Sequence, residues 1–222
     1  MILVIRAAII ALSLALCTDC ATARPKLATG TITVAPPAPD LSGVLSIMGA
    51  TGMAQACPIA ADKALTAGHV AKEIQLVGTP TPIPYIWESS GHLGLLGDRQ
   101  TTVWDRFRDL AYVTPYQSTF PRWYTIAHDA PKPGDKVRFR GFDFRRKRDA
   151  FAPRDFQAIV LRVVNGHVIF SPPGVHGTSG SCVLNEAGEV VAINSFGADM
   201  EDRNTVGGAV GVWGDLLELG TS

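Results

Sequence analysis

From about residue 43 onward the chain alternates short apolar runs with turn residues, and this pattern predicts a protein built mostly of β-strands. The runs are brief and carry many branched or aromatic side chains, which favours strands over helices. The first group of predicted strands covers residues 43–50, 55–59, 64–67, 74–77, 83–87, 101–104 and 109–113. The second group covers residues 136–142, 155–164, 166–170, 181–184, 190–195 and 206–212.

Turn signals and a connector separate these runs. Asn165-Gly166 and residues 186–189 are hairpin signals. Residues 118–135, which hold three prolines, connect the two groups of strands. The tail at 213–219 predicts a short helix, since its leucines can share one buried side.

The N-terminal segment predicts export. Arg6 precedes a largely apolar run at 7–16, which is too short for a membrane span of about 20 residues. Ala21-Thr22-Ala23 then gives the small-x-small pattern of a signal-peptide cleavage site. We therefore expect a signal peptide over 1–23 and a periplasmic or secreted protein. A Pro/Ala-rich linker over 24–41 follows.

Two alternatives to a cleaved signal peptide stay open. Cys17 could carry a lipid anchor, although Leu16 is a poor fit where lipoproteins have a small residue. The segment could also be an uncleaved anchor or reflect a mis-assigned start.

Composition is that of a globular protein, with 46% hydrophobic and 18% charged residues in a chain of 222. The 20 basic and 20 acidic side chains give zero net charge, so no nucleic acid or anionic membrane is expected as a partner. A short run of basic residues at 138–148 surrounds two phenylalanines, and we interpret it as a solvated hairpin. The folded domain is predicted over 42–222.

The segment Gly177-Thr178-Ser179-Gly180-Ser181 carries the first candidate chemistry. A serine hydroxyl becomes a nucleophile when a base takes its proton and backbone N–H groups stabilise the oxyanion. Small residues on both sides of Ser179 allow a sharp turn that aims the amides of Gly177 and Ser179 at one point. Ser181 is a rival nucleophile, but only Ser179 has the Gly-x-Ser-Gly frame. In isolation such a cluster is more often an ordinary turn.

Two upstream residues complete a candidate triad. His69 lies just after the strand-like run at 64–67, and Asp109 begins the one at 109–113. A Ser–His–Asp relay needs an imidazole base and a carboxylate that fixes its tautomer. Asp98 and Asp105 compete with Asp109, which is favoured because the strand after it would fix its carboxylate at a buried edge. The chain order is His, Asp, Ser.

These three stretches resemble the chymotrypsin/trypsin-like serine peptidase family. Thr-Ala-Gly-His at 66–69 is similar to the family's Thr-Ala-Ala-His, Asp-Leu-Ala at 109–111 to its Asp-Ile-Ala, and Gly-Thr-Ser-Gly-Ser at 177–181 to its Gly-Asp-Ser-Gly-Gly. The resemblance implies an all-β fold of two antiparallel β-barrels, at about 42–117 and 136–212. It also implies an endopeptidase that hydrolyses peptides or proteins through an acyl-enzyme intermediate, without a cofactor.

The resemblance further assigns a substrate-binding region. Pro173 would lie at the base of the primary pocket, and Asn194, Ser195, Phe196 and Gly197 would form the wall on which an extended substrate adds as a β-strand. No acid stands at the pocket base, so a preference for Arg or Lys is not expected.

Thr178 departs from the animal digestive enzymes. Those enzymes carry an aspartate at this place, which binds the N-terminal amine released on activation. We therefore expect activity without such a switch, as in the compact bacterial and viral members. A non-catalytic scaffold on the same fold is the main alternative, and a lipid-anchored envelope protein is another.

The remaining histidines and cysteines are the candidates for metal binding and for a disulfide. His92, His128, His167 and His176 are scattered without ligand spacing, so no metal is expected. Signal removal takes Cys17 and Cys20, which leaves Cys57 and Cys182. If His69 and Ser179 meet, the strands that carry these two cysteines approach each other, and export permits a disulfide. Two buried free thiols are the alternative.

Overall fold

The structure is a computed structural model of the full chain, and it describes residues 45–49, 52–76, 83–87, 92–97, 103–105, 108–141, 154–197 and 206–214. All of these lie in one compact unit, Pro36–Ser222. The signal peptide, the linker, most of the basic run at 138–148 and most of the C-terminal helix at 213–219 lie outside the described residues.

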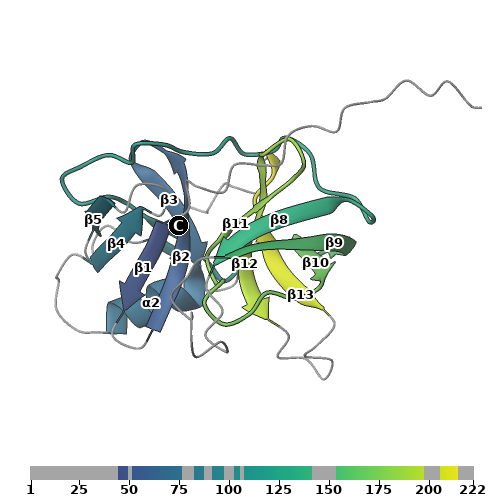
Figure 1. Ribbon diagram of the computed structural model, residues 1–222, viewed down its shortest axis with the longest axis horizontal. Helices are drawn as coiled ribbons and strands as arrows, with labels where there is room; N and C mark the ends of the chain where they lie inside the picture. Colours follow the sequence, from purple (N-terminus) through teal and green to yellow (C-terminus); the bar gives the residue numbers. More distant parts are fainter. Residues whose placement is uncertain are drawn as a thin grey trace, which may run out of the picture. The chain divides into compact units, whose positions relative to one another are not determined.

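The first half of the unit is a seven-stranded antiparallel sheet (Figure 1). Its strands in chain order are β1 (Leu45–Gly49), β2 (Gly52–Ala60), β3 (Lys63–Ala67), β4 (Ile83–Trp87), β5 (His92–Leu96), β6 (Val103–Asp105) and β7 (Leu110–Val113). They are ordered β5-β4-β1-β2-β3-β7-β6. The long strand β2 pairs with β1 along its first part and with β3 along its last, so it bends across the whole half.

This first sheet is open, whereas the sequence predicted a closed barrel. One contact brings its edge strand β5 back toward β7. Leu96 forms a β-bridge with Pro115, Gly97 N–H donates to Thr114 O, and Tyr116 N–H donates to Leu95 O. The connection is a short bridge to the segment after β7, so closure is incomplete among the described residues.

Helix α2 (Gly68–Leu76) replaces one predicted strand. We expected residues 74–77 to be extended because the apolar run there is short, and such runs are ambiguous between strand and helix. The run instead continues the helix that starts at Gly68, and Asp109 accepts hydrogen bonds from the N–H groups of Gly68 and His69. That acceptor lies forty residues away along the chain, beyond the reach of any local pattern.

The second half is a closed antiparallel barrel, as the sequence predicted. Its strands are β8 (Lys136–Gly141), β9 (Arg154–Val164), β10 (His167–Ser171), β11 (Cys182–Leu184), β12 (Val190–Gly197) and β13 (Gly207–Gly211). They close in the order β10-β13-β12-β11-β8-β9. The hairpin at Asn165-Gly166 joins β9 to β10, with both residues at positive φ.

Three buried clusters hold the unit together. One fills the first sheet around Leu45, Ile47 and Tyr85, and one fills the barrel around Phe139 and Phe170. The third joins the two halves, because it packs residues of the first sheet against β11, β12 and β13: Cys57, Leu65, Leu110, Tyr124, Cys182, Leu184, Val190, Ile193, Val210 and Val212. The two halves therefore share one apolar interface.

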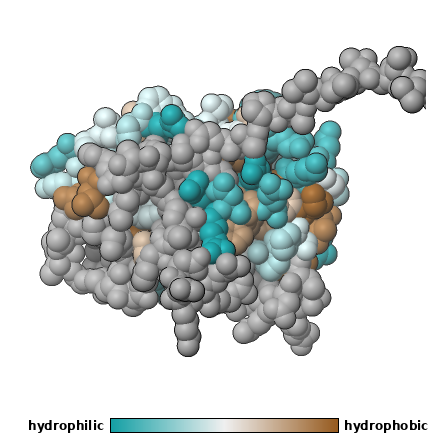
Figure 2. All heavy atoms as spheres, viewed as in Figure 1, coloured by the Kyte–Doolittle hydropathy of each residue, from teal (hydrophilic) through white to brown (hydrophobic). Residues whose placement is uncertain are grey.

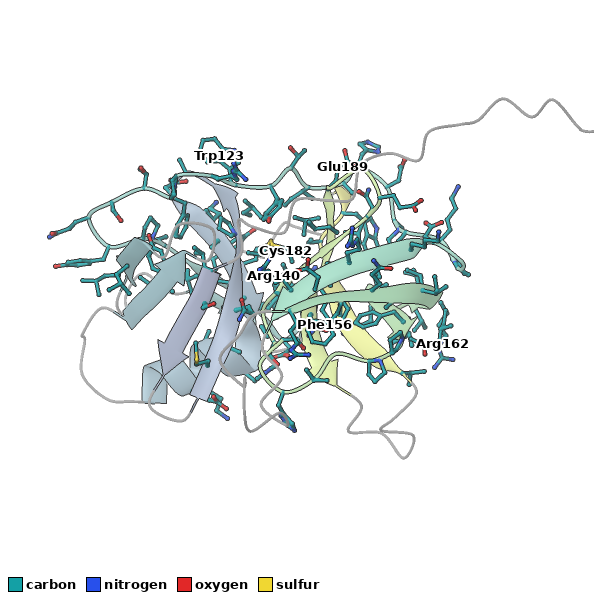
Figure 3. The ribbon with its side chains drawn as sticks, viewed as in Figure 1. Trp123, Arg140, Phe156, Arg162, Cys182 and Glu189 are labelled. Atoms are coloured by element: carbon teal, nitrogen blue, oxygen red, sulfur yellow. A yellow bond between two sulfur atoms is a disulfide. The ribbon has the colours of Figure 1, made fainter. Side chains whose placement is uncertain are left out.

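A disulfide crosses this interface. Cys57 on β2 and Cys182 on β11 are bonded, with their Cα atoms 5.0 Å apart and both side chains fully buried. Figure 3 shows Cys182 where the barrel faces the first sheet. The predicted pairing is confirmed.

Most large apolar side chains that reach the surface lie on outer strands. Figure 2 shows apolar patches over β5 and at the outer end of β9, where Leu93, Leu95, Ile159 and Leu161 are exposed. In the part of the chain that the structure describes, no helix has the length and apolar character needed to cross a membrane.

Candidate active site

His69 and Asp109 form a pair at the start of helix α2. The Asp109 carboxylate accepts two hydrogen bonds from the same residue: the His69 backbone N–H reaches Oδ1 at 2.6 Å, and the imidazole Nδ1 lies 2.9 Å from Oδ2. The Asp109 carbonyl also accepts the Gly68 N–H at 2.8 Å. One aspartate therefore caps the helix and fixes the histidine ring at the same time.

The backbone at Asp109 explains how one residue does both. Asp109 has a φ of 51°, in the left-handed region that aspartate tolerates better than most residues. It lies in the turn that leads into β7, one residue before the strand, whereas the sequence predicted it as the strand's first residue. This turn faces the carboxylate toward the end of β3, which pairs with β7 and carries the chain to His69.

Ser195 makes a contact with Asp109 that the sequence analysis did not predict. Its hydroxyl donates a short hydrogen bond to Asp109 Oδ2, the oxygen that also faces the imidazole. The register between β12 and β13 shifts between Asn194 and Phe196, so Ser195 is the extra residue of a bulge. Bulges re-aim side chains. Only the tertiary pairing of β12 reveals this contact, so sequence spacing carried no signal for it.

The pair's electrostatics follow from these contacts. The hydrogen bond to the Asp109 carboxylate raises the pKa of His69 above its ordinary value of 6.5, against an opposing effect of burial, and Glu73 adds a smaller upward effect. Burial by itself raises the pKa of Asp109, but hydrogen bonds from His69 and Ser195 outweigh it, so that this pKa lies below its ordinary value. Asp109 is thus a carboxylate at neutral pH and favours the imidazolium form of His69.

The loop that carries Ser179 is docked on the first sheet. The Gln55 N–H on β2 donates to the Ser179 carbonyl at 2.8 Å, and the Thr66 hydroxyl on β3 donates to the Gln55 carbonyl at 2.8 Å. Gly180 has a φ of 85°, and a Cβ there would collide with the Gln55 carbonyl and the Thr66 hydroxyl. Glycine is therefore required at this close approach. Because Thr66 lies three residues before His69, the docking brings the Ser179 loop to the strand end that carries the histidine.

Ser179 is partly exposed, and its hydroxyl makes no hydrogen bond within the described part of the chain. The structure thus joins His69 to Asp109 directly and brings Ser179 to the same region through β2 and β3. Hydrogen bonds between catalytic groups are often long before substrate binds.

Backbone hydrogen bonds use some N–H groups of this loop and leave others without a backbone acceptor among the described residues. The N–H groups of Thr178, Gly180 and Ser181 donate to carbonyls of Val175, Asn194 and Thr178 respectively. No backbone hydrogen bond found between described residues uses the N–H of Gly177 or of Ser179. Gly177 adopts a φ of 96°, which glycine permits because it has no Cβ. The amides of Gly177 and Ser179, which the sequence analysis proposed for an oxyanion hole, are among the loop amides without a backbone acceptor in the described part of the chain, together with those of Gly174, Val175 and His176.

The rival nucleophile Ser181 is unsuited to that role. It is fully buried, and its hydroxyl donates to the Thr178 carbonyl at 2.7 Å. The hydroxyl therefore serves the inside of the loop.

The predicted substrate-binding residues fall into two groups. Asn194 is buried and directs its side chain to Thr178, so its side chain does not line a substrate wall. Gly197 pairs with Gly207 on β13, and a Cβ at Gly207 would lie 2.9 Å from the Pro173 Cα. Pro173 and Gly197 thus lie at the same end of the barrel. For Phe196 only the backbone, within β12, is described.

No group of three His, Cys, Asp or Glu side chains that could hold a metal ion is found among the described residues. His128 forms a hydrogen bond with the Asp129 carboxylate, and His167 forms one with the Asn165 carbonyl, both at the surface. The described groups at this site are a hydroxyl, an imidazole, a carboxylate and backbone N–H groups.

Comparison with known proteins identifies the fold. No protein-family model matches the chain, and no curated protein sequence does. Among solved structures, a Glu endopeptidase superposes with a TM-score of 0.67 at 13% identity, covering 82% of this chain and 89% of that one. The serine protease of a human pathogenic astrovirus gives 0.58 at 15% identity, covering 80% and 93%. A serine endoprotease from Yersinia pestis gives 0.61 at 18% identity, covering 78% of this chain and 59% of that one.

The astrovirus and Yersinia pestis proteins are serine proteases by name and the first is named an endopeptidase, and the chain has the fold of the chymotrypsin-like serine proteases. At these identities the likeness concerns the fold alone.

Proposed function

We propose that this protein is a serine endopeptidase in which Ser179 is the nucleophile, His69 the general base and Asp109 the residue that orients His69. The observation that carries the proposal is the double contact of Asp109 with His69. A carboxylate that holds both the backbone N–H and Nδ1 of one histidine leaves the opposite ring nitrogen, Nε2, free to accept a proton. The docked loop with Ser179 provides the hydroxyl.

The reaction follows from these positions. His69 Nε2 takes the Ser179 proton as the hydroxyl oxygen attacks the scissile carbonyl, and the amides of Gly177 and Ser179 stabilise the oxyanion. His69 then gives the proton to the leaving amine, so that the C–N bond breaks and an acyl-enzyme remains. Water, deprotonated by His69, hydrolyses the ester and restores Ser179. Asp109 stays ionised and stabilises the imidazolium in each step.

Burial favours Ser179 over the two other serines near the site as the nucleophile. Ser195 is 2% exposed and Ser181 is fully buried, and each hydroxyl donates to a protein oxygen. A nucleophile must meet a substrate carbonyl, so neither can serve. Ser179 is the partly exposed serine of the Gly-x-Ser-Gly frame, and neither its own N–H nor that of Gly177 has a backbone acceptor among the described residues.

Substrate and location belong to the same proposal. The substrates are peptides or proteins that lie along β12 and end near Pro173, a residue that has no charge with which to bind Arg or Lys. We propose that the protein is exported after cleavage behind Ala23, which suits a chain whose buried Cys57–Cys182 bond forms in an oxidising compartment. The intact mass of protein recovered from the periplasm or medium tests the cleavage site.

Active-site labelling tests the chemistry. A fluorophosphonate should modify wild-type protein, and peptide mass spectrometry should place the adduct on Ser179. Ser179→Ala should abolish labelling and reduce casein hydrolysis by about 10⁴-fold or more while the fold persists. Ser195→Ala is the matched control: it removes a hydroxyl next to Asp109, so activity falls but the adduct stays on Ser179. An adduct on Ser195, or undiminished hydrolysis by Ser179→Ala, contradicts the assignment.

A further inference from the structure

We propose that the buried pair Thr178–Asn194 is the positioning element that holds the oxyanion hole in its working geometry. This inference rests on the proposed function. Thr178 lies between the two residues whose amides would bind the oxyanion, Gly177 and Ser179. Both Thr178 and Asn194 are 1% exposed, so neither touches a substrate and both act through the loop.

Every polar atom of Thr178 is used. Asn194 Nδ2 donates to the Thr178 carbonyl at 2.9 Å and to Oγ1 at 2.8 Å. Thr178 Oγ1 in turn donates to the Val175 carbonyl at 2.7 Å, as does the Thr178 N–H at 3.0 Å. Ser181 Oγ adds a second donor to the Thr178 carbonyl at 2.7 Å. Rotating either peptide bond beside Thr178 would break several buried hydrogen bonds, each costly to leave unmade.

The backbone of Asn194 holds the other side of Ser179. Its carbonyl accepts the Gly180 N–H at 2.7 Å, and its N–H donates to the Ser181 carbonyl at 3.0 Å. Asn194 therefore contacts the loop before and after the nucleophile. The next residue, Ser195, donates to Asp109. A single segment of β12 thus connects the proposed oxyanion hole to the residue that orients the base.

The pair is uncharged. Thr178 meets Asn194, Val175 and Ser181 through neutral groups only, so its order needs no ion pair with a liberated N-terminal amine. The Thr178 methyl fills space against Gly141, where a Cβ would lie 2.7 Å from Thr178 Cγ2. Packing and hydrogen bonding at Thr178 can therefore be separated by substitution.

Two variants of the full-length protein make that separation. Thr178→Val keeps the shape and the methyl packing but removes Oγ1, whereas Thr178→Ser keeps Oγ1 and loses the methyl. For Thr178→Val, kcat should fall by about 10²-fold with KM little changed, because misplaced oxyanion donors act on the transition state. Thr178→Ser should keep kcat close to wild type. A role in packing alone gives the reverse order.

Asn194→Ser tests the pair from its other side and decides the matter if Thr178→Val does not fold. It retains the backbone bonds to Gly180 and Ser181 and removes the amide that reaches Thr178, so the same loss of kcat is expected. Combining it with Thr178→Val should add little further loss, as for one unit. A peptide-aldehyde inhibitor, whose adduct carries the oxyanion, should weaken in parallel with kcat.

Asn185→Ala controls for general destabilisation. Asn185 makes two side-chain hydrogen bonds to Glu189 in a hairpin outside the site, so its loss should lower Tm and leave kcat unchanged. Wild-type kcat in both Thr178→Val and Asn194→Ser overturns the inference while the proposed function stands. Failure of wild-type protein to label at Ser179 overturns the proposed function first.

Discussion

Removal of the Cys57–Cys182 bond should cost the protein much of its stability. The bond closes a loop of 125 residues, since 182 − 57 = 125, and it joins β2 of the first sheet to β11 of the barrel. In the chain-entropy description such a loop contributes about 5 kcal/mol at 25 °C, because the reduced unfolded chain gains that much freedom. Small domains unfold with about 5–15 kcal/mol in total, so a third or more of the stability is involved.

The measurement compares oxidised wild type with Cys57→Ala/Cys182→Ala in urea, with tryptophan fluorescence and far-UV circular dichroism as probes. The unfolding midpoint should drop, and the m-value should rise because the uncrosslinked unfolded chain exposes more surface. Alanine at two fully buried positions also removes two sulfur atoms from the shared interface, which adds to the loss.

Cys57→Ser/Cys182→Ser separates this packing effect from the cross-link, because serine is close to cysteine in size but buries a hydroxyl. Wild type reduced in the unfolded state gives a third reference with both sulfurs present. A loss below about 1 kcal/mol in all three comparisons would refute the reasoning, since the chain-entropy contribution would then be absent or offset by native strain.

Four further outcomes are expected. The value of kcat/KM should decline as pH falls through a pKa above 6.5, because Asp109 raises the pKa of His69 and the base must be neutral. Asp109→Asn should move the midpoint of this decline to lower pH. A rate that is flat from pH 5 to 9 in folded protein would contradict a histidine base. The same raised pKa means that the pair's contribution to stability is full at pH below 6.5 and is lost as pH rises through the folded value, as urea midpoints at several pH values should show. Gly180→Ala should destabilise the protein and abolish labelling, since its φ is positive and the new Cβ would meet a carbonyl of β2; full activity would show that the loop docks differently. Protein that begins at Arg24 should be as active as protein that begins at Leu41, and strict dependence on the shorter form would contradict the absence of an N-terminal switch.

The sequence by itself pointed to the candidate catalytic residues, because their signals are local patterns. His69, Asp109 and Ser179 each stand at the end or start of an apolar run, next to small residues, and this arrangement is visible without coordinates. Cys57 and Cys182 were predicted to meet for a related reason: each lies on a strand that leads to or from one of these residues. Alternation and hairpin signals predicted the strands of the second half, and the resemblance to the chymotrypsin/trypsin-like family predicted that they close into a barrel.

Only the tertiary structure decided how those residues are held. Residues 74–77 could not be assigned to helix α2 because the acceptor that caps it, Asp109, lies forty residues away. The role of Ser195 depends on a bulge between β12 and β13, and a one-residue change of register reverses the face of a side chain. The resemblance placed Asn194 in the wall on which a substrate adds as a β-strand, and the structure shows that its side chain turns inward to Thr178. Local sequence specifies which groups are present, whereas register and long-range hydrogen bonds specify where they point.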